Sequence, residues 1–167
     1  DPRKDLPTLL RSFKLIMSSY ENAQLVIIGG EAPKALVELL KSLCISESVS
    51  FLGRVDDPEE EYKRADVVVI SSLQEGLCLS LLEAMDFATP VVSTRCGGPE
   101  SYIEAGVNGY LVEKRSPEDL SRAVLAVIGK REVRDEMGQA AFRRIGVLCD
   151  PRRIAGMVEE VWSEALK

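Results

Sequence analysis

The stretch SSLQEGLCLSLLEAM, residues 71–85, contains residue types that could bind a phosphorylated sugar. Glu75 is followed directly by Gly76, and a glycine allows the backbone to approach a ligand closely. Glu83 lies further along the same stretch, where its carboxylate can accept hydrogen bonds from vicinal hydroxyl groups. The alternative is structural, because single acids in loops and on helices are commonly just exposed to solvent.

A helix that begins near Cys78 would give this stretch an anion-binding end. The apolar run DVVVI ends near Ser72, and the pattern after Cys78 is typical of a helix. The first amides of a helix have no internal partner and carry a partial positive charge, so they can face a phosphate. The amides concerned belong to Leu77, Cys78, Leu79 and Ser80. Together with Glu83, they predict a site for phosphate and sugar.

Short apolar runs rich in β-branched residues alternate along the chain with helix-like segments. The predicted strands are 24–28, 48–52, 66–70, 90–94 and 109–112, and the predicted helices are 8–19, 33–44, 58–64, 79–87, 99–105 and 117–128. This alternation predicts an α/β fold, a doubly wound parallel sheet with helices on both faces. In such a sheet ligands bind beyond the carboxyl ends of the strands, which is where Glu75 is expected.

The two ends of the chain depart from this alternation. The chain opens on a helix-like segment, whereas a complete mononucleotide-binding unit opens on a strand, so we expect the first strand to be absent. After the strand at 109–112 no further strand is predicted, and residues 117–167 read as helices that break near 146–151.

The composition excludes several classes of function. The 167 residues are 46% hydrophobic and 29% charged, which suits one globular domain. No apolar run approaches the roughly 20 residues of a membrane-spanning helix. The 21 basic residues are outnumbered by 27 acidic ones, and the net charge of −6 argues against extensive wrapping of nucleic acid. We therefore expect small molecules or proteins as partners and no nucleic acid.

The cysteines do not form a metal-binding pattern. They stand singly, no CxxC pair occurs and the chain contains no histidine, so no metal site is predicted. Scattered single cysteines without an apolar leader fit a reducing compartment. We expect a cytoplasmic location, with a peripheral membrane association of the full-length protein left open.

A longer stretch, ADVVVISSLQEGLCLSLLEAMDFATPVVSTRCGGPESYIEAGVNGYLV, resembles the donor-binding half of retaining GT-B glycosyltransferases of the sucrose-synthase and mannosyltransferase-like family, the glycosyl transferases group 1. In that family an E-G-aromatic-G-x-x-x-x-E-A-M segment is followed by P-V-V, a Gly-Gly turn and G-x-L-V. The upstream segments LPTLLRSFKLI, QLVIIGG and VSFLGRVDD fall in the same order as the family's elements. The resemblance covers residues 3–128 and implies a Rossmann-like domain.

The resemblance implies roles for the two acids. Glu83 matches the carboxylate that binds the ribose, and Glu75 matches the glutamate near the transferred sugar. The residues between them match positions around the diphosphate and sugar, namely Gly76, Leu77, Cys78, Leu79 and Ser80.

The resemblance also implies contacts outside this stretch. Val55, after FLGR, matches a backbone contact to the base, and Arg54 is its neighbour. Lys4 resembles the lysine that neutralises the leaving diphosphate, and its usual arginine partner would lie before Asp1. The alternative for Lys4 is a solvated lysine near the end of the chain.

Three residues depart from the family pattern, and two glycines have a plainer, structural explanation. Leu77 and Cys78 replace an aromatic residue and a glycine, and the Cys78 side chain is expected where the family has bare backbone near phosphate. Ala88 replaces a glycine, a small change compatible with close helix packing. Gly97 and Gly98 are expected to form a strand-to-helix turn rather than a ligand contact.

Taken together, the resemblance implies that residues 1–167 form the nucleotide-sugar (donor) domain of a retaining glycosyltransferase whose N-terminal acceptor domain is absent. The reaction would move a hexose from a UDP-, GDP- or ADP-sugar to a hydroxyl of a sugar or lipid-linked acceptor. No cofactor and no metal is expected. Two alternatives stay open: a regulatory GT-B module that binds nucleotide without catalysis, and a nucleotide-sugar epimerase or hydrolase.

Overall fold

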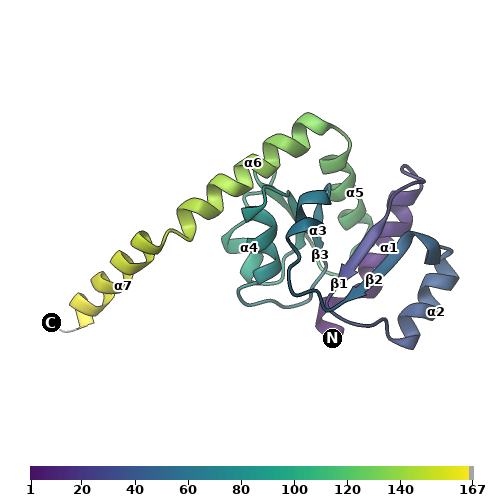
Figure 1. Ribbon diagram of the computed structural model, residues 1–167, viewed down its shortest axis with the longest axis horizontal. Helices are drawn as coiled ribbons and strands as arrows, with labels where there is room; N and C mark the ends of the chain where they lie inside the picture. Colours follow the sequence, from purple (N-terminus) through teal and green to yellow (C-terminus); the bar gives the residue numbers. More distant parts are fainter. Residues whose placement is uncertain (166–167) are drawn as a thin grey trace.

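The computed structural model describes residues 1–165 and shows an α/β body from which the last helices extend (Figure 1). The strands are β1 Leu25–Ile28, β2 Val49–Gly53, β3 Val68–Ile70, β4 Val91–Thr94 and β5 Gly109–Val112. The α-helices are α1 Leu6–Met17, α2 Lys34–Leu43, α3 Glu59–Arg64, α4 Leu79–Asp86, α5 Pro117–Ile128, α6 Arg131–Leu148 and α7 Pro151–Ala165. Three short 3-10 helices are η1 Pro2–Lys4, η2 Ser46–Ser48 and η3 Gly98–Ser101.

All strand pairing in the described residues is parallel, as predicted. The strands form two sheets, β1 with β2 and β3 with β4 and β5. In the doubly wound strand order, a further strand would lie between β1 and β3 and would join the two sheets. The expectation of an absent first strand stays a prediction.

The central strand β4 shows why helices must cover both faces. All four of its residues are buried. Val91 packs with α4 and α6, whereas Val92 packs with α1 and α5 on the other face. Side chains alternate along a strand, so a strand that is apolar throughout must be covered on both sides. The confirmed fold is therefore a layered α/β domain with helices on both faces.

One predicted helix is wrong. Residues 99–105 were expected to be helical, but the structure has only the 3-10 turn η3 there. The buried side chain of Asn108 competes for the backbone of this segment: its Oδ1 accepts from the Glu104 amide at 2.7 Å, and its Nδ2 donates to the Tyr102 carbonyl at 3.0 Å. These bonds hold a turn where a helix would need the same groups.

The C-terminal helices break where the sequence predicts, between α6 and α7 at Cys149 and Asp150. Helix α6 packs against α4, whereas α7 extends away from the body (Figure 1). The apolar side chains of Met157, Val161 and Trp162 on α7 are exposed. Within residues 1–165, no helix is long and apolar enough to cross a membrane.

Helix α6 contacts the turn that follows α4, and their backbones approach each other closely. A Cβ added at Gly138 would lie 1.9 Å from the carbonyl oxygen of Ala88. Ala88 itself has a left-handed backbone, with φ of 54°. This explains why a glycine suits position 88, and the close packing expected around Ala88 is confirmed at the Gly138 contact.

The two glycines of α6 therefore predict opposite responses to alanine. We expect Gly138→Ala to lower the free energy of unfolding by about 2 kcal/mol or more, because the new methyl group would overlap a backbone oxygen. Gly146→Ala is the matched control, since nothing lies within 4 Å of its Cβ position. Alanine there should raise the free energy of unfolding by up to about 1 kcal/mol. Urea unfolding of both variants measures this, and equal effects would contradict the assigned packing.

Candidate functional site

The loop that carries Glu75 is held by backbone contacts with the turn after β4. The Glu75 amide donates to the Cys96 carbonyl at 2.7 Å, and the Gly98 amide donates to the Glu75 carbonyl at 3.1 Å. A Cβ at Gly98 would lie 1.7 Å from the Gly76 carbonyl oxygen, and Gly97 has a positive φ of 114°. The expected turn role of both glycines is confirmed. They allow the backbones of two loops to touch.

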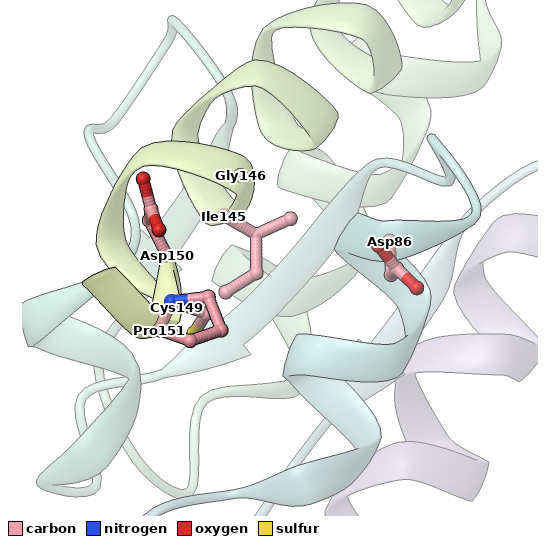
Figure 2. A pocket seen from close by; sticks show the side chains of 6 residues that line it. All are labelled: Asp86, Ile145, Gly146, Cys149, Asp150 and Pro151. Atoms are coloured by element: carbon pink, nitrogen blue, oxygen red, sulfur yellow. The ribbon is translucent and has the colours of Figure 1, made fainter. Parts of the chain in front are cut away.

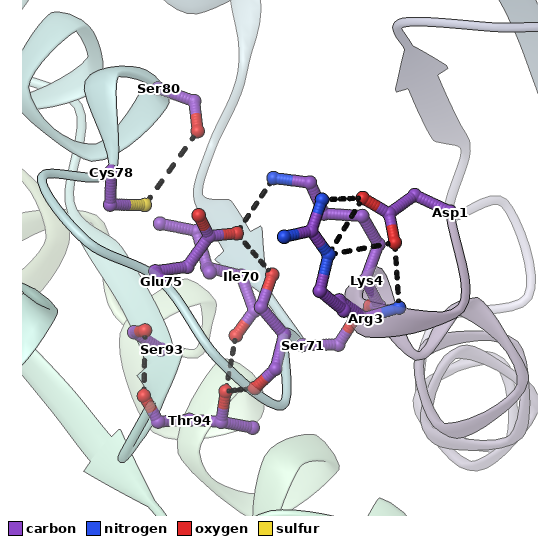
Figure 3. Close-up of polar contacts among 11 residues, drawn as sticks. Asp1, Arg3, Lys4, Ile70, Ser71, Glu75, Cys78, Ser80, Ser93 and Thr94 are labelled. Atoms are coloured by element: carbon purple, nitrogen blue, oxygen red, sulfur yellow. Dashed lines mark hydrogen bonds and ion pairs between the residues drawn. The ribbon is translucent and has the colours of Figure 1, made fainter. Parts of the chain in front are cut away.

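The side chain of Glu75 forms an ion pair with Lys4 (Figure 3). Lys4 Nζ lies 2.6 Å from Glu75 Oε1, and Ser72 Oγ donates to the same oxygen at 2.6 Å. Burial raises the pKa of the Glu75 carboxyl, but the hydrogen bonds from Lys4 and Ser72 outweigh it, so the pKa lies below its ordinary value. In the described residues no side chain bonds Oε2, which leaves this oxygen available to a ligand.

Lys4 is brought to the site by bonds from the strand end after β3. Ser71 Oγ donates to the Lys4 carbonyl at 2.7 Å, and the Leu73 amide donates to the Arg3 carbonyl at 2.6 Å. These bonds attach η1 to the loop that carries Glu75. Lys4 is thus paired within the site, although its side chain is half exposed.

The start of α4 has an unusual backbone at one residue. Cys78 has a left-handed backbone with φ of 58°, and its side chain is buried in the core beside Leu81 and Cys96. The side chain is thus covered by the core rather than exposed at the loop, and its expected place near phosphate stays a prediction. The positive φ is the reason that a glycine suits this position, and burial raises the pKa of the Cys78 thiol.

Among the described residues, no side chain caps the first amides of α4. The exposed side chains of Leu77 and Leu79 lie at this end of the helix, and Ser80 is half-buried. Gly76 leaves open space, since nothing lies within 4 Å of its Cβ position. This end of α4 can thus receive an anion beside Lys4 and Glu75.

Glu83 lies on the exposed side of α4 and has one side-chain partner in the described part of the chain. Tyr62 Oη donates to Glu83 Oε2 at 2.8 Å. Sequence reasoning missed Tyr62, because a tyrosine in a helix is commonly just part of the core. It also missed Ser71 and Ser72, although two serines directly after an apolar strand are a signal for polar groups at its carboxyl end.

Two predicted residues lie apart from this group. Arg54 and Val55 follow β2, and Arg54 pairs with Asp56 at 3.3 Å while both of these side chains are almost fully exposed. No bond within residues 1–165 joins Arg54 to Glu75 or Glu83. Their proposed contact with the base rests on their place at the carboxyl end of a parallel strand.

A hollow of the surface lies at the C-terminal helices. It has a volume of about 290 Å³, sits where α6 turns into α7 and is lined by Asp86, Ile145, Gly146, Cys149, Asp150 and Pro151 (Figure 2). It includes none of the predicted site residues. In the part of the chain that the structure describes, no cluster of three or more cysteine and acidic residues could hold a metal ion.

The Glu75 geometry predicts a pH dependence that requires Lys4. A carboxyl whose pKa is lowered on folding stabilises the fold above its unfolded pKa, and this stability is lost as pH falls through the folded pKa. We expect the pKa of Glu75 to lie below the ordinary value of a glutamate and Lys4→Met to raise it. Lys14→Met, which removes an exposed lysine of α1, should leave it unchanged. NMR titration of the Glu75 carboxyl measures this, and equal pKa values in wild type and Lys4→Met would contradict the ion pair.

Comparisons with known proteins identify the family of this chain. Residues 1–144 match the family Glycosyl transferases group 1. A D-inositol 3-phosphate glycosyltransferase of Geodermatophilus obscurus is 36% identical over 132 residues, which are 78% of this chain and 29% of that protein. The chain spans less than half the length of the curated relatives it matches.

Solved structures show the same fold. The Anabaena protein HepE in complex with UDP has a TM-score of 0.84 at 22% identity, over 96% of this chain and 46% of that chain. The C-terminal domain of a glycosyl transferase group 1 family protein from Francisella tularensis has a TM-score of 0.79 at 25% identity, over 88% of this chain and 80% of that one. These neighbours are GT-B glycosyltransferases with Rossmann-like domains. The chain belongs to the glycosyl transferases group 1 family.

Proposed function

We propose that this chain is the nucleotide-sugar (donor) domain of a retaining glycosyltransferase that moves a hexose from a nucleoside diphosphate sugar to an acceptor hydroxyl. The observation that carries the proposal is the Lys4–Glu75 ion pair of 2.6 Å beside the uncapped start of α4. A cation, free amides and an acid with one open oxygen match a ligand that combines a diphosphate with a sugar.

The charges of this group suit the departure of a diphosphate. Negative charge develops on the leaving group, and preorganised donors that face it lower the barrier. Lys4 has three N–H donors, and the bond to Glu75 occupies one, so the ammonium group can also bind a phosphate oxygen. Glu75 would keep its charge and orient the sugar or stabilise the electron-poor anomeric carbon. No metal or cofactor enters this proposal.

The relatives support a nucleoside diphosphate sugar as the donor. HepE structures contain UDP, UDP-glucose, and UDP with glucose. UDP is therefore the first nucleotide to test, with GDP and ADP as competitors. The acceptor, a sugar or a lipid-linked molecule, would be bound by a further domain, because the relatives extend well beyond the length of this chain. We propose a cytoplasmic location for the reaction.

Nucleotide titrations test the donor site. We expect the chain to bind one of UDP, GDP and ADP selectively, and Glu83→Ala to weaken this binding about tenfold or more, since hydrogen bonds to a charged group are lost. Glu38→Ala is the matched control, because Glu38 is an exposed acid on α2. Calorimetry and circular dichroism measure binding and fold. A folded chain that binds none of the three would contradict the donor site, and Glu83→Ala with unchanged affinity would contradict the role of Glu83.

Transfer assays separate the enzyme from its alternatives. We expect the isolated chain to transfer little sugar, because the acceptor would bind outside it. Rapid transfer by the chain alone would contradict that division of the active site. Conversion of a nucleotide sugar without any acceptor would favour the epimerase or hydrolase instead.

A further inference from the structure

The contact between Tyr62 and Glu83 joins two helices across the site. Tyr62 lies on α3 and Glu83 on α4, and the phenol donates to Oε2 at 2.8 Å. Tyr62 is buried, with 8% of its surface exposed, whereas Glu83 is exposed. A buried donor thus reaches out to one oxygen of a surface carboxylate.

The phenol is held in place by its surroundings. The Tyr62 ring stacks on Phe87 with centroids 5.9 Å apart and an interplanar angle of 15°. Its carbonyl accepts a hydrogen bond from Thr89 Oγ1 at 2.8 Å. Phe87 and Thr89 directly follow α4, the helix that carries Glu83. Tyr62 is therefore held by the same short stretch of chain that carries Glu83, and its phenol has little freedom to turn away from the carboxylate.

The Tyr62 phenol is a neutral hydrogen-bond donor, so it does not neutralise the Glu83 carboxylate. Burial raises the pKa of Tyr62 well above its ordinary value, and the bond to Glu83 adds to the rise, so the phenol is protonated at neutral pH. In the described residues, no lysine or arginine lies within 4.0 Å of the Glu83 carboxylate. No cation therefore pairs with Glu83 there, and within residues 1–165 no side chain bonds its Oε1.

We propose that Tyr62 is a positioning residue that makes the nucleotide site select ligands with ribose hydroxyl groups. It fixes Oε2 of Glu83 and leaves the charged Oε1 to accept hydrogen bonds from the 2′ and 3′ hydroxyls. A free glutamate side chain would lose rotamer freedom on binding, and the bond from Tyr62 has already restricted it. This inference rests on the proposed donor function and adds to it a residue that orders the Glu83 carboxylate before the nucleotide binds.

The test compares UDP with 2′,3′-dideoxyuridine diphosphate, which lacks both hydroxyls. Calorimetry gives the affinity ratio of the two ligands for wild type, Tyr62→Phe and Glu83→Ala. We expect Tyr62→Phe to reduce the preference for UDP about five- to tenfold, by weakening UDP while the dideoxy nucleotide binds as before. Tyr20→Phe is the matched control, since this exposed tyrosine lies in the turn after α1 and should leave the ratio unchanged.

The double variant tests whether Tyr62 acts through Glu83. In a Glu83→Ala background, Tyr62→Phe should change the ratio no further, because the carboxylate it positions is gone. If Tyr62→Phe weakens both nucleotides equally, or retains the full preference for UDP, Tyr62 is only a packing residue and the inference is wrong. If wild type binds GDP or ADP rather than UDP, the same comparison is made with that nucleotide and its dideoxy form. If wild type binds none of the three, the proposed donor function is wrong, and this inference, which rests on it, is wrong as well.

Discussion

The backbone contact between the loop before α4 and the turn after β4 is the constraint on which the rest of the site depends. Glu75 is hydrogen-bonded on one side to Cys96 and on the other to Gly98. Because the Gly98 Cβ position lies 1.7 Å from the Gly76 carbonyl, only a glycine allows the two loops to touch. This contact fixes the place from which the Glu75 side chain reaches Lys4, and α4 begins directly after it.

The two acids of the site have partners of different charge, and this separates what they can do. Glu75 is paired with the cation Lys4, which keeps its carboxylate charged and adds a positive group where a diphosphate would lie. Glu83 is bonded by the neutral phenol of Tyr62, which orders the carboxylate without cancelling its charge. One acid therefore belongs to an ion pair that an anion can enter, and the other is a charged acceptor suited to hydroxyl groups.

Much of the fold could be predicted because its signals are local. The five strands lie within a residue or two of the predicted runs, because each run is a short apolar stretch rich in β-branched residues. The helix at Pro117–Ile128 was predicted with its bounds, because Ser116 caps it and a proline opens it. The helix predicted at 99–105 is wrong, because backbone groups of this segment are hydrogen-bonded to the side chain of Asn108. Asn108 lies later in the chain, and no helical pattern reveals that its side chain is buried.

The sequence by itself determined that Glu75, Gly76 and Glu83 surround the start of a helix after a buried strand, because these residues are neighbours in the chain and their spacing follows from helix geometry. Only the tertiary structure decided which groups they meet. Lys4 lies 71 residues from Glu75 along the chain, and Tyr62 lies 21 residues from Glu83. Such contacts arise when separate elements pack, and the same packing, rather than any turn pattern, requires a glycine at Gly138.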